Sequence, residues 1–262
     1  MPTYLDKIIE DHRERARTDL RSTRDLWLKA LDTEPCLGFR KALLGSGVSI
    51  IAEIKRRSPS KGELNVALDS VSQAKSYEAF GASCISVLTD ENYFAGSLED
   101  LRQVRRNVQI PLLRKDFTVC ANDVIDARIN GADAVLLIVA ALSQRELADL
   151  HGLALEVGLD VLVEVHDEGE LARANDVGAD LVGVNQRNLF TFEVDTQKAA
   201  EMAKLFSSGV VKVCESGISS GKQMQMLAKA GYNAALVGEV LVRSTHPGQT
   251  LLGLLDAGRS GS

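Results

Sequence analysis

Short apolar runs rich in β-branched residues recur along the chain, and segments with helical spacing separate them. Eight such runs occupy residues 48–55, 82–90, 110–117, 133–140, 160–167, 181–185, 211–218 and 234–241. Strands that alternate with helices predict right-handed βαβ units and a parallel sheet. Eight evenly spaced units favour a closed (β/α)8 barrel. An open doubly wound sheet would usually carry GxGxxG after its first strand, and that motif does not follow the first run.

The first 47 residues do not fit this repeat. They predict helices near residues 2–21 and 23–32, packed beside or across one mouth of the barrel. No linker, low-complexity tract or second domain interrupts the remainder. We therefore expect one barrel domain over residues 1–262, with residues 1–47 as an N-terminal helical extension.

Composition and charge limit the possible partners. The chain has 262 residues and a formal net charge of -6, which argues against the basic surface that nucleic acids require. A local cluster of Lys and Arg could still hold a small anion. No apolar stretch approaches the roughly 18 residues of a membrane span, and the charged N-terminus lacks the apolar core of a signal peptide. We expect a cytoplasmic protein with neither a nucleic-acid partner nor a membrane partner.

Cysteine and histidine positions give no sign of a disulfide framework or a metal centre. The cysteines are Cys36, Cys84, Cys120 and Cys214, and none of them belongs to a CxxC pair. We interpret each as a buried free thiol, as is common for isolated cysteines in a reducing compartment. The four histidines lack metal-ligand spacing, so we expect no metal ion.

Charged and polar side chains gather near the ends of the strand-like runs, where (β/α)8 barrels place their working residues. In chain order they are Glu53, Lys55, Lys115, Glu164, Asn185 and Glu215. Strand side chains alternate between faces, so Glu53 and Lys55 share one face. In the run at 160–167, three valines form a face suited to the outer helices, which leaves Glu164 pointing into the barrel. The same alternation aligns Lys115 with Leu113 and Phe117.

Two interpretations of this convergence remain open. Isolated buried charges are costly, so they persist only when they are paired or used. One interpretation is a structural ring of ion pairs that closes the top of the barrel. The other is an acid–base site, in which coupled lysines and glutamates have altered proton affinities. Five such side chains at one mouth favour the acid–base site.

The loops after the seventh and eighth runs predict a phosphate site. Barrels commonly bind phosphate there through backbone N–H groups. Gly217 and Gly238 allow close approach of the backbone, and Ser216 offers a hydroxyl. The loop "RRSPSKG" after the first run adds Ser58 and several cations, and it could fold over an anionic ligand.

Seven stretches resemble, in order, the signature strands of the indole-3-glycerol-phosphate synthase family. They are "EIKRRSPSKG", "LLRKDF", "DAVLLIVAAL", "LVEVHDEGEL", "GVNQRNL", "VCESGI" and "LVGEVL", and they lie within residues 48–243. The resemblance implies a ribulose-phosphate-binding barrel of tryptophan biosynthesis that uses no cofactor. Its substrate would be 1-(2-carboxyphenylamino)-1-deoxyribulose 5-phosphate, and its products indole-3-glycerol phosphate, carbon dioxide and water.

The resemblance also implies roles for the charged residues. Lys115 would be the general acid of ring closure, and Glu164 the base of the dehydration. Lys55 would hold the substrate carboxylate or hydroxyls, or act as the acid of the dehydration. Glu53 would orient and tune both lysines, while Asn185 and Glu215 would bind sugar hydroxyls.

Further residues are implied as substrate contacts. Ser58, Gly217 and Gly238 match phosphate-binding positions, with Ser216 beside them. Glu239 follows Gly238 where serine occurs in relatives, so we expect only its backbone to contact the phosphate. The apolar slot for the anthranilate ring would use Phe94, Phe117 and Leu136, although these could equally be barrel core. Arg187 would brace the site.

Two other functions remain as alternatives. Phosphoribosylanthranilate isomerase uses a related barrel, but its Amadori rearrangement does not require two inward lysines. A catalytically silent barrel that binds a phosphorylated metabolite would have no physical need to bury the whole charged set. We expect a monofunctional enzyme and a monomer, with a homodimer as the alternative.

Overall fold

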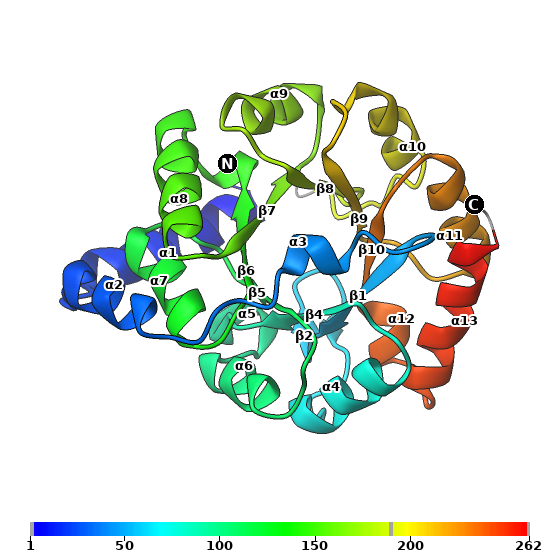
Figure 1. The fold of residues 1–262 in the computed structure, drawn as a ribbon, viewed down its shortest axis with the longest axis horizontal. Helices are drawn as coiled ribbons and strands as arrows, with labels where there is room; N and C mark the ends of the chain where they lie inside the picture. The colour runs from blue at the N-terminus through cyan, green and yellow to red at the C-terminus, as the bar shows by residue number, and fades with distance from the viewer. Residues whose placement is uncertain (1–2, 189–190, 261–262) are drawn as a thin grey trace.

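The structure is a computed structural model that describes residues 3–188 and 191–260, and its strands close into a barrel (Figure 1). The predicted (β/α)8 architecture is confirmed, because every strand in the ring runs parallel to both neighbours. The strands are β1 (Ser49–Ile54), β4 (Cys84–Leu88), β5 (Leu112–Lys115), β6 (Ala134–Ile138), β7 (Asp160–Val165), β8 (Leu181–Asn185), β9 (Val211–Glu215) and β10 (Ala234–Val237). β10 pairs with β1 and closes the ring. The ends of the predicted 1–262 domain, and Leu189 of "GVNQRNL", lie outside the described residues.

Helices surround the strand ring in Figure 1. The longer ones are α4 (Ser70–Ala79), α6 (Leu98–Arg105), α7 (Ala121–Ile129), α8 (Gln144–Glu156), α9 (Glu168–Asp176), α11 (Gly221–Lys229) and α13 (Pro247–Arg259). The shorter ones are α5 (Glu91–Phe94), α10 (Lys198–Met202) and α12 (Glu239–Val242), with 3-10 turns η1 (Val139–Ala141) and η2 (Ala203–Leu205). Polar caps start several of them: Asp69 accepts a hydrogen bond from the Ser72 backbone N–H, and Asp167 from that of Glu170. Gly231, at φ +75°, turns the chain back into the sheet after α11.

Alternating side chains divide the apolar interior into two layers. Val161, Val163 and Val165 belong to the cluster between the strands and the outer helices. Leu162, on the same strand, belongs to a second cluster that fills the barrel itself. The predicted alternation along this strand is therefore confirmed, and it leaves Glu164 on the inward face.

The N-terminal extension contains α1 (Tyr4–Thr18), α2 (Thr23–Leu31) and α3 (Phe39–Ala42). Figure 1 shows α3 over the middle of the strand ring and α2 beside α7, against which it packs. Phe39 at the start of α3 is fully buried in the inner barrel cluster. The backbone N–H of Arg40 donates to Asp160 at the start of β7. The extension thus closes the amino-terminal end of the barrel with α3, whereas α1 reaches the opposite mouth.

The cysteines differ from the prediction in degree. All four are free thiols, and Cys84 and Cys214 are buried as expected, but Cys36 and Cys120 are only partly buried. Burial raises the pKa of both Cys36 and Cys120 to about 11, so their thiols stay protonated at neutral pH. Among the helices that the structure describes, none is both long and apolar enough to cross a membrane.

Candidate active site

A cavity of about 860 Å³ opens at the carboxyl ends of the strands. Its walls include all the residues to which the family resemblance assigns a role in catalysis or substrate binding. They are Glu53, Lys55, Ser58, Phe94, Lys115, Phe117, Leu136, Glu164, Asn185, Arg187, Glu215, Ser216, Gly217, Gly238 and Glu239. Side chains from strands far apart in the sequence thus share one cavity at the mouth where barrel enzymes carry out chemistry.

Lys115 lies between two carboxylates at the centre of this cavity. Its Nζ donates to Glu164 Oε2 at 2.8 Å and to Glu215 Oε2 at 3.0 Å. Asn185 donates from Nδ2 to the other oxygen of Glu164 at 3.0 Å. Glu164 and Glu215 are each only 2% exposed, so the three charges interact with little solvent between them. This arrangement can hold and move a proton.

The proton affinities of the three groups diverge. Burial would lower the pKa of Lys115, but the charges of Glu164 and Glu215 outweigh it and raise the pKa. Burial alone would raise the pKa of Glu164, yet Lys115 and other partners hold it well below its usual value. Burial and repulsion from Glu164 raise the pKa of Glu215 despite its contact with Lys115. Divergent proton affinities at one site are the condition for paired acid and base roles.

Glu53, on the inward face of β1, and Lys55, just past the end of β1, form an ion pair, as their spacing predicts. This ion pair holds the Lys55 side chain in the cavity wall. Glu53 contacts Lys55 directly, whereas it reaches Lys115 only through its charge. A Cβ added to Gly238, which directly follows β10, would lie 2.4 Å from Glu53 Oε1, so glycine at this position makes room for the Glu53 carboxylate.

Gly183 on β8 makes room in the same way for Glu215. A Cβ at this position would lie 2.0 Å from Glu215 Oε1, while Gly183 itself has no left-handed backbone angle that alanine would resist. We expect Gly183→Ala to displace Glu215 from Lys115 and to lower kcat roughly 100-fold, the cost of a misplacement of about 1 Å. Steady-state kinetics would measure the loss.

The matched control is Gly152→Ala in α8, where an added Cβ meets nothing within 4 Å. That variant should keep full activity and gain up to about 1 kcal/mol of helix stability. Equal activity in the two variants would show that the position of Glu215 does not matter.

Apolar and aromatic side chains line one side of the cavity. Phe94 and Phe117 lie with their ring centroids 6.1 Å apart, and Leu136 belongs both to this wall and to the inner barrel cluster. From α1, Tyr4, Leu5 and Ile8 add to the cavity wall. The contribution of α1 to the site was not predicted from the sequence. An apolar stripe at these positions was its signal, but any helix that packs on a barrel shows such a stripe.

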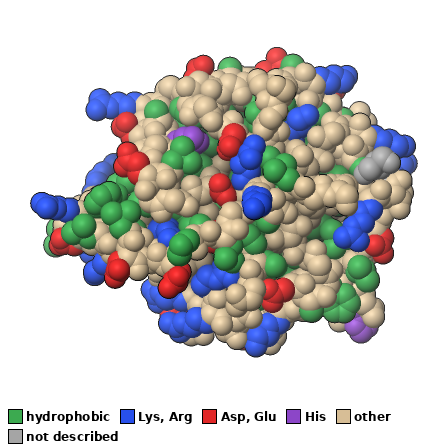
Figure 2. Space-filling view, viewed as in Figure 1, with side chains coloured by type: hydrophobic (Ala, Val, Ile, Leu, Met, Phe, Trp, Pro, Cys, Tyr) green, Lys and Arg blue, Asp and Glu red, His purple; other side chains and the backbone are tan. Residues whose placement is uncertain are grey.

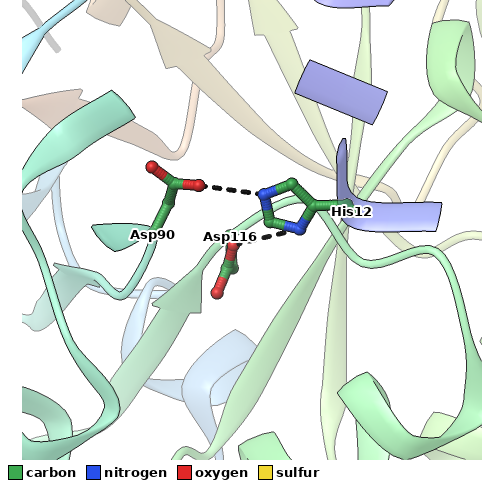
Figure 3. A group of neighbouring side chains, drawn as sticks. All are labelled: His12, Asp90 and Asp116. Atoms are coloured by element: carbon green, nitrogen blue, oxygen red, sulfur yellow. Dashed lines mark hydrogen bonds and ion pairs between the residues drawn. The ribbon is translucent and has the colours of Figure 1, made fainter. Parts of the chain in front are cut away.

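His12 fixes α1 to this wall (Figure 3). It is 3% exposed, its ring centroid lies 5.3 Å from that of Phe117, and its Nε2 lies 2.9 Å from Asp90 Oδ2. Arg15 approaches Nδ1 at 2.8 Å and can only donate, so Nδ1 accepts and Nε2 carries the proton. The other oxygen of Asp90 caps α5 by accepting from the backbone N–H groups of Tyr93 and Phe94. The contacts of His12 and Asp90 therefore fix α1, Phe94 and Phe117 relative to one another.

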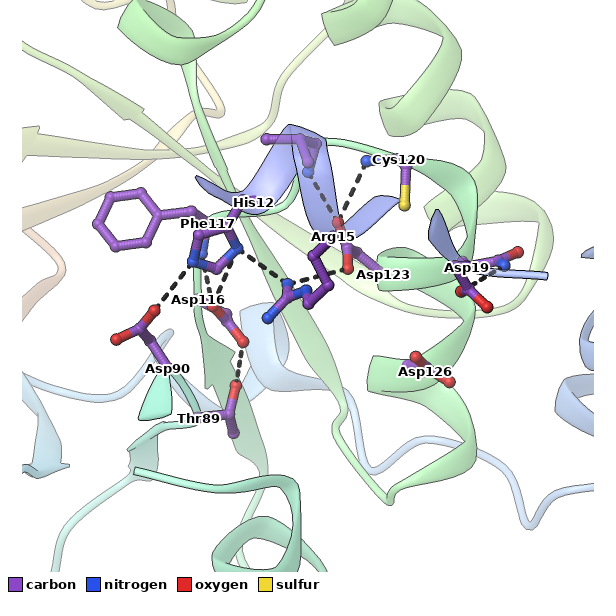
Figure 4. Close-up of polar contacts among 12 residues, drawn as sticks. His12, Arg15, Asp19, Thr89, Asp90, Asp116, Phe117, Cys120, Asp123 and Asp126 are labelled. Carbon is purple, nitrogen blue, oxygen red and sulfur yellow. Dashed lines mark hydrogen bonds and ion pairs between the residues drawn. The ribbon is translucent and has the colours of Figure 1, made fainter. Parts of the chain in front are cut away.

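His12, Asp90 and Asp116 also have the ligand types of a metal site, with their ligand atoms within 4.8 Å of one another. Figure 4 shows the wider network, in which Arg15 reaches both His12 and Asp123. The buried Arg114 donates to Asp116 at 2.8 Å. Arg15 thus binds one ring nitrogen of His12 and Arg114 binds one oxygen of Asp116, and the cluster is best described as a network of ion pairs and hydrogen bonds.

The opposite side of the cavity carries the loops expected to bind phosphate. Ser216 and Gly217 both have left-handed backbone angles, at φ +68° and +76°. Such strain in a residue other than glycine tends to occur at binding sites. Amides of Gln186 and Gln223 hold the carbonyl oxygens of Ser216 and Gly217, each at 2.8 Å. Val194 and Arg243, which the sequence analysis did not select, also line the cavity.

Other predicted residues near the site have structural partners. Arg56 and Arg57, the two arginines of the loop "RRSPSKG", do not line the cavity. Arg56 pairs with Asp100 at 2.7 Å, and Arg57 donates to the Tyr93 carbonyl. The loop that carries them contains a short hairpin of β2 (Arg57–Ser58) and β3 (Gly62–Glu63), which the sequence patterns did not predict. Arg187 donates to the Phe192 carbonyl and braces its loop. The Glu239 side chain pairs with Arg243 at 3.3 Å.

Comparison with solved structures shows that the fold is shared with phosphate-handling barrels. A thiamine phosphate pyrophosphorylase from Pyrococcus furiosus aligns with a TM-score of 0.62 at 15% identity, over 84% of this chain and 98% of that one. The N-acetylmannosamine-6-phosphate 2-epimerase from Clostridium perfringens gives a TM-score of 0.60 at 15% identity, over 76% and 90% of the two chains. At this identity the likeness concerns the fold alone.

Sequence comparison identifies the family. The family model described as indole-3-glycerol phosphate synthase matches residues 5–253. Proteins of that name from Koribacter versatilis and Chlorobium phaeovibrioides are 44% and 46% identical. The first alignment covers 97% of this chain and 100% of the relative, and the second covers 91% and 94%. The chain belongs to the indole-3-glycerol phosphate synthase family, a family of carboxy-lyases in tryptophan biosynthesis.

Proposed function

We propose that this protein converts 1-(2-carboxyphenylamino)-1-deoxyribulose 5-phosphate to indole-3-glycerol phosphate, carbon dioxide and water by general acid–base catalysis, without a cofactor. The observation that carries the proposal is the pairing of Lys115 with Glu164 and Glu215 inside one cavity. Ring closure needs an acid at a carbonyl oxygen, and dehydration needs a base. The family membership of the chain agrees with this chemistry.

In ring closure, Lys115 donates its proton to the carbonyl oxygen of the ribulose as the carboxylate-bearing ring carbon attacks the carbonyl carbon. The new C–C bond removes the aromaticity of the ring. Loss of carbon dioxide leaves its electron pair in the ring and restores that aromaticity. Lys55, held by Glu53, faces the same cavity and binds the substrate carboxylate or hydroxyls.

In the dehydration, the new hydroxyl leaves as water with a proton from Lys55, and Glu164 accepts a proton from the five-membered ring. Asn185 fixes the Glu164 carboxylate by its hydrogen bond. Glu215 and Asn185 bind the sugar hydroxyls. Phe94, Phe117 and Leu136 pack on the anthranilate ring, while Arg187 braces the loop beside it.

The substrate phosphate binds between the loops of Gly217 and Gly238, with Ser58 and Ser216 as hydroxyl donors and the backbone of Glu239 nearby. We expect inorganic phosphate to inhibit competitively, because it occupies the same loops. Ser58→Ala should weaken this inhibition while leaving kcat nearly unchanged. Noncompetitive inhibition in steady-state kinetics would place the anion elsewhere.

The direct test of the activity is to mix the purified protein with the synthetic substrate and follow indole fluorescence. We expect product formation that releases one carbon dioxide per indole. If the protein instead consumes the N-linked phosphoribosyl anthranilate without forming an indole, the isomerase reaction is correct. Binding without turnover of either compound would identify a silent barrel.

The proposal also includes the domain organisation, location and oligomeric state of the protein. Residues 1–262 form a single barrel domain, of which residues 1–47 are the extension. The protein works as a cytoplasmic monomer on a small phosphosugar, without nucleic acid. Figure 2 shows Lys, Arg, Asp and Glu side chains interspersed on the face over α3, in keeping with the net charge of -6. Sedimentation at working concentrations would reveal a homodimer if one forms.

A further inference from the structure

A histidine outside the cavity lies next to Glu164, the proposed base. His166 follows β7 by one residue, and its Nε2 lies 3.5 Å from Glu164 Oε1. Its Nδ1 lies 3.0 Å from Glu170 Oε2 in α9, and the same oxygen accepts from the His166 backbone N–H at 2.7 Å. His166 does not line the cavity. Its influence on the reaction would therefore pass through Glu164.

The two carboxylates determine the charge of the imidazole. A neutral imidazole has one N–H and one lone pair, whereas the imidazolium ion has two N–H groups. If Nδ1 alone carried the proton, the lone pair of Nε2 would face Glu164. If Nε2 alone carried it, the lone pair of Nδ1 would face Glu170. Only the imidazolium directs an N–H toward each carboxylate.

The surroundings of His166 agree with a positive charge. Among the described residues the buried Nε2 has no hydrogen-bond partner, so the nearby Glu164 oxygen is the acceptor open to it. The strongest charges acting on the ring are those of Glu164 from β7, Glu170 from α9 and Glu215 from β9, all acidic. Lys115 from β5 is bonded to the other oxygen of Glu164. Burial lowers the pKa of His166, but the bond to Glu170 and the charge of Glu164 outweigh burial and raise it.

The proposed reaction changes the charge next to Glu164, and a positive charge on His166 would offset that change. Before ring closure, Lys115 stabilises the ionised form of Glu164. Once Lys115 has given its proton to the substrate, Glu164 is a buried carboxylate that has lost that cation. A buried carboxylate without a cation takes up a proton readily, and a protonated Glu164 cannot act as a base.

We propose that His166, as an imidazolium clamped by Glu170, is a positioning residue that keeps Glu164 ionised after Lys115 has been discharged. This inference rests on the proposed function, because it needs Lys115 as the first acid and Glu164 as the later base. No covalent step is added: His166 keeps its proton throughout and supplies charge alone.

The pH dependence provides the functional test. The raised pKa means that His166 stays charged below that pKa and loses its proton as the pH rises through it. The kcat of the natural protein should fall across this range. We expect His166→Gln to lower kcat about tenfold, the lower limit for an opposite charge near a carboxylate, and to remove the fall in kcat at high pH.

Glu170→Gln should move the fall in kcat to lower pH, because it removes the carboxylate that favours the charged ring. His151→Gln, at a buried histidine in α8 away from the cavity, is the matched control and should retain the natural profile.

A spectroscopic measurement on the unmodified protein is independent of activity and of mutant folding. The 15N shifts of His166 at neutral pH should be those of an imidazolium, and its titration midpoint should match the fall in kcat. Neutral-ring shifts, or a His166→Gln variant with natural kcat at every pH, would overturn the inference. If the natural protein forms no indole, the proposed function fails, whichever charge the spectrum shows.

Discussion

Lys115→Arg should slow indole formation severely while leaving the protein folded. Arginine keeps a positive charge between Glu164 and Glu215, but it does not give up its proton in proteins. General acid catalysis typically contributes about 10²–10⁴-fold, so we expect kcat to fall by about that factor. Single-turnover mixing, monitored by indole fluorescence, would measure the loss.

Lys115→Met provides the comparison for this variant. It removes the acid and also leaves two buried carboxylates without their cation, so the protein should lose about 3–5 kcal/mol of stability. Uptake of a proton by Glu215, whose pKa is already raised, would limit that loss. Two denaturant titrations would show whether Met costs more than Arg. If Lys115→Arg retained activity, Lys115 would serve as a fixed charge and the structural-ring interpretation would regain support.

Glu164→Gln should lower kcat by a similar factor of about 10²–10⁴ with little change in stability. The glutamine oxygen can still accept from Asn185, and Lys115 keeps Glu215 as a partner. The dehydration would then lack its base. We therefore expect the decarboxylated but undehydrated intermediate to accumulate, with carbon dioxide released faster than indole fluorescence grows.

Quenched-flow analysis of both products would separate the two steps. The matched control is Glu168→Gln, at an exposed carboxylate in α9 that does not line the cavity, and it should leave both rates unchanged. If Glu164→Gln released carbon dioxide and formed indole at equal rates, a different residue would perform the dehydration.

The sequence predicted which strand side chains face the barrel interior, because the alternation of side chains is a local property of a strand. Side chains alternate along any strand, and a face of valines on β7 leaves Glu164 inside. The same rule puts Glu53 and Lys55 together. The recurring apolar runs also depend only on local sequence, so the barrel and the gathering of charges at one mouth could be predicted from short-range patterns.

The ion-pair partner of each charged side chain could not be predicted from the sequence, because it depends on how neighbouring strands are staggered. The family resemblance implies that Glu53 orients and tunes both lysines. Glu53 contacts Lys55 and acts on Lys115 through its charge, but the contacts of Lys115 with Glu164 and Glu215 were not predicted. Gly183 shows the same limit: its role appears only when β9 lies beside it. Nor could any local pattern show that α3 closes one end of the barrel while α1 borders the other.

The crystal structure of the protein with indole-3-glycerol phosphate bound would test the central claim most directly. We expect the phosphate between the Gly217 and Gly238 loops, the indole ring against Phe94 and Phe117, and Lys115 and Glu164 within hydrogen-bond reach of the atoms that exchange protons. Product bound at another surface, or in this cavity with Lys115 and Glu164 remote from the sugar and the new ring, would contradict the account.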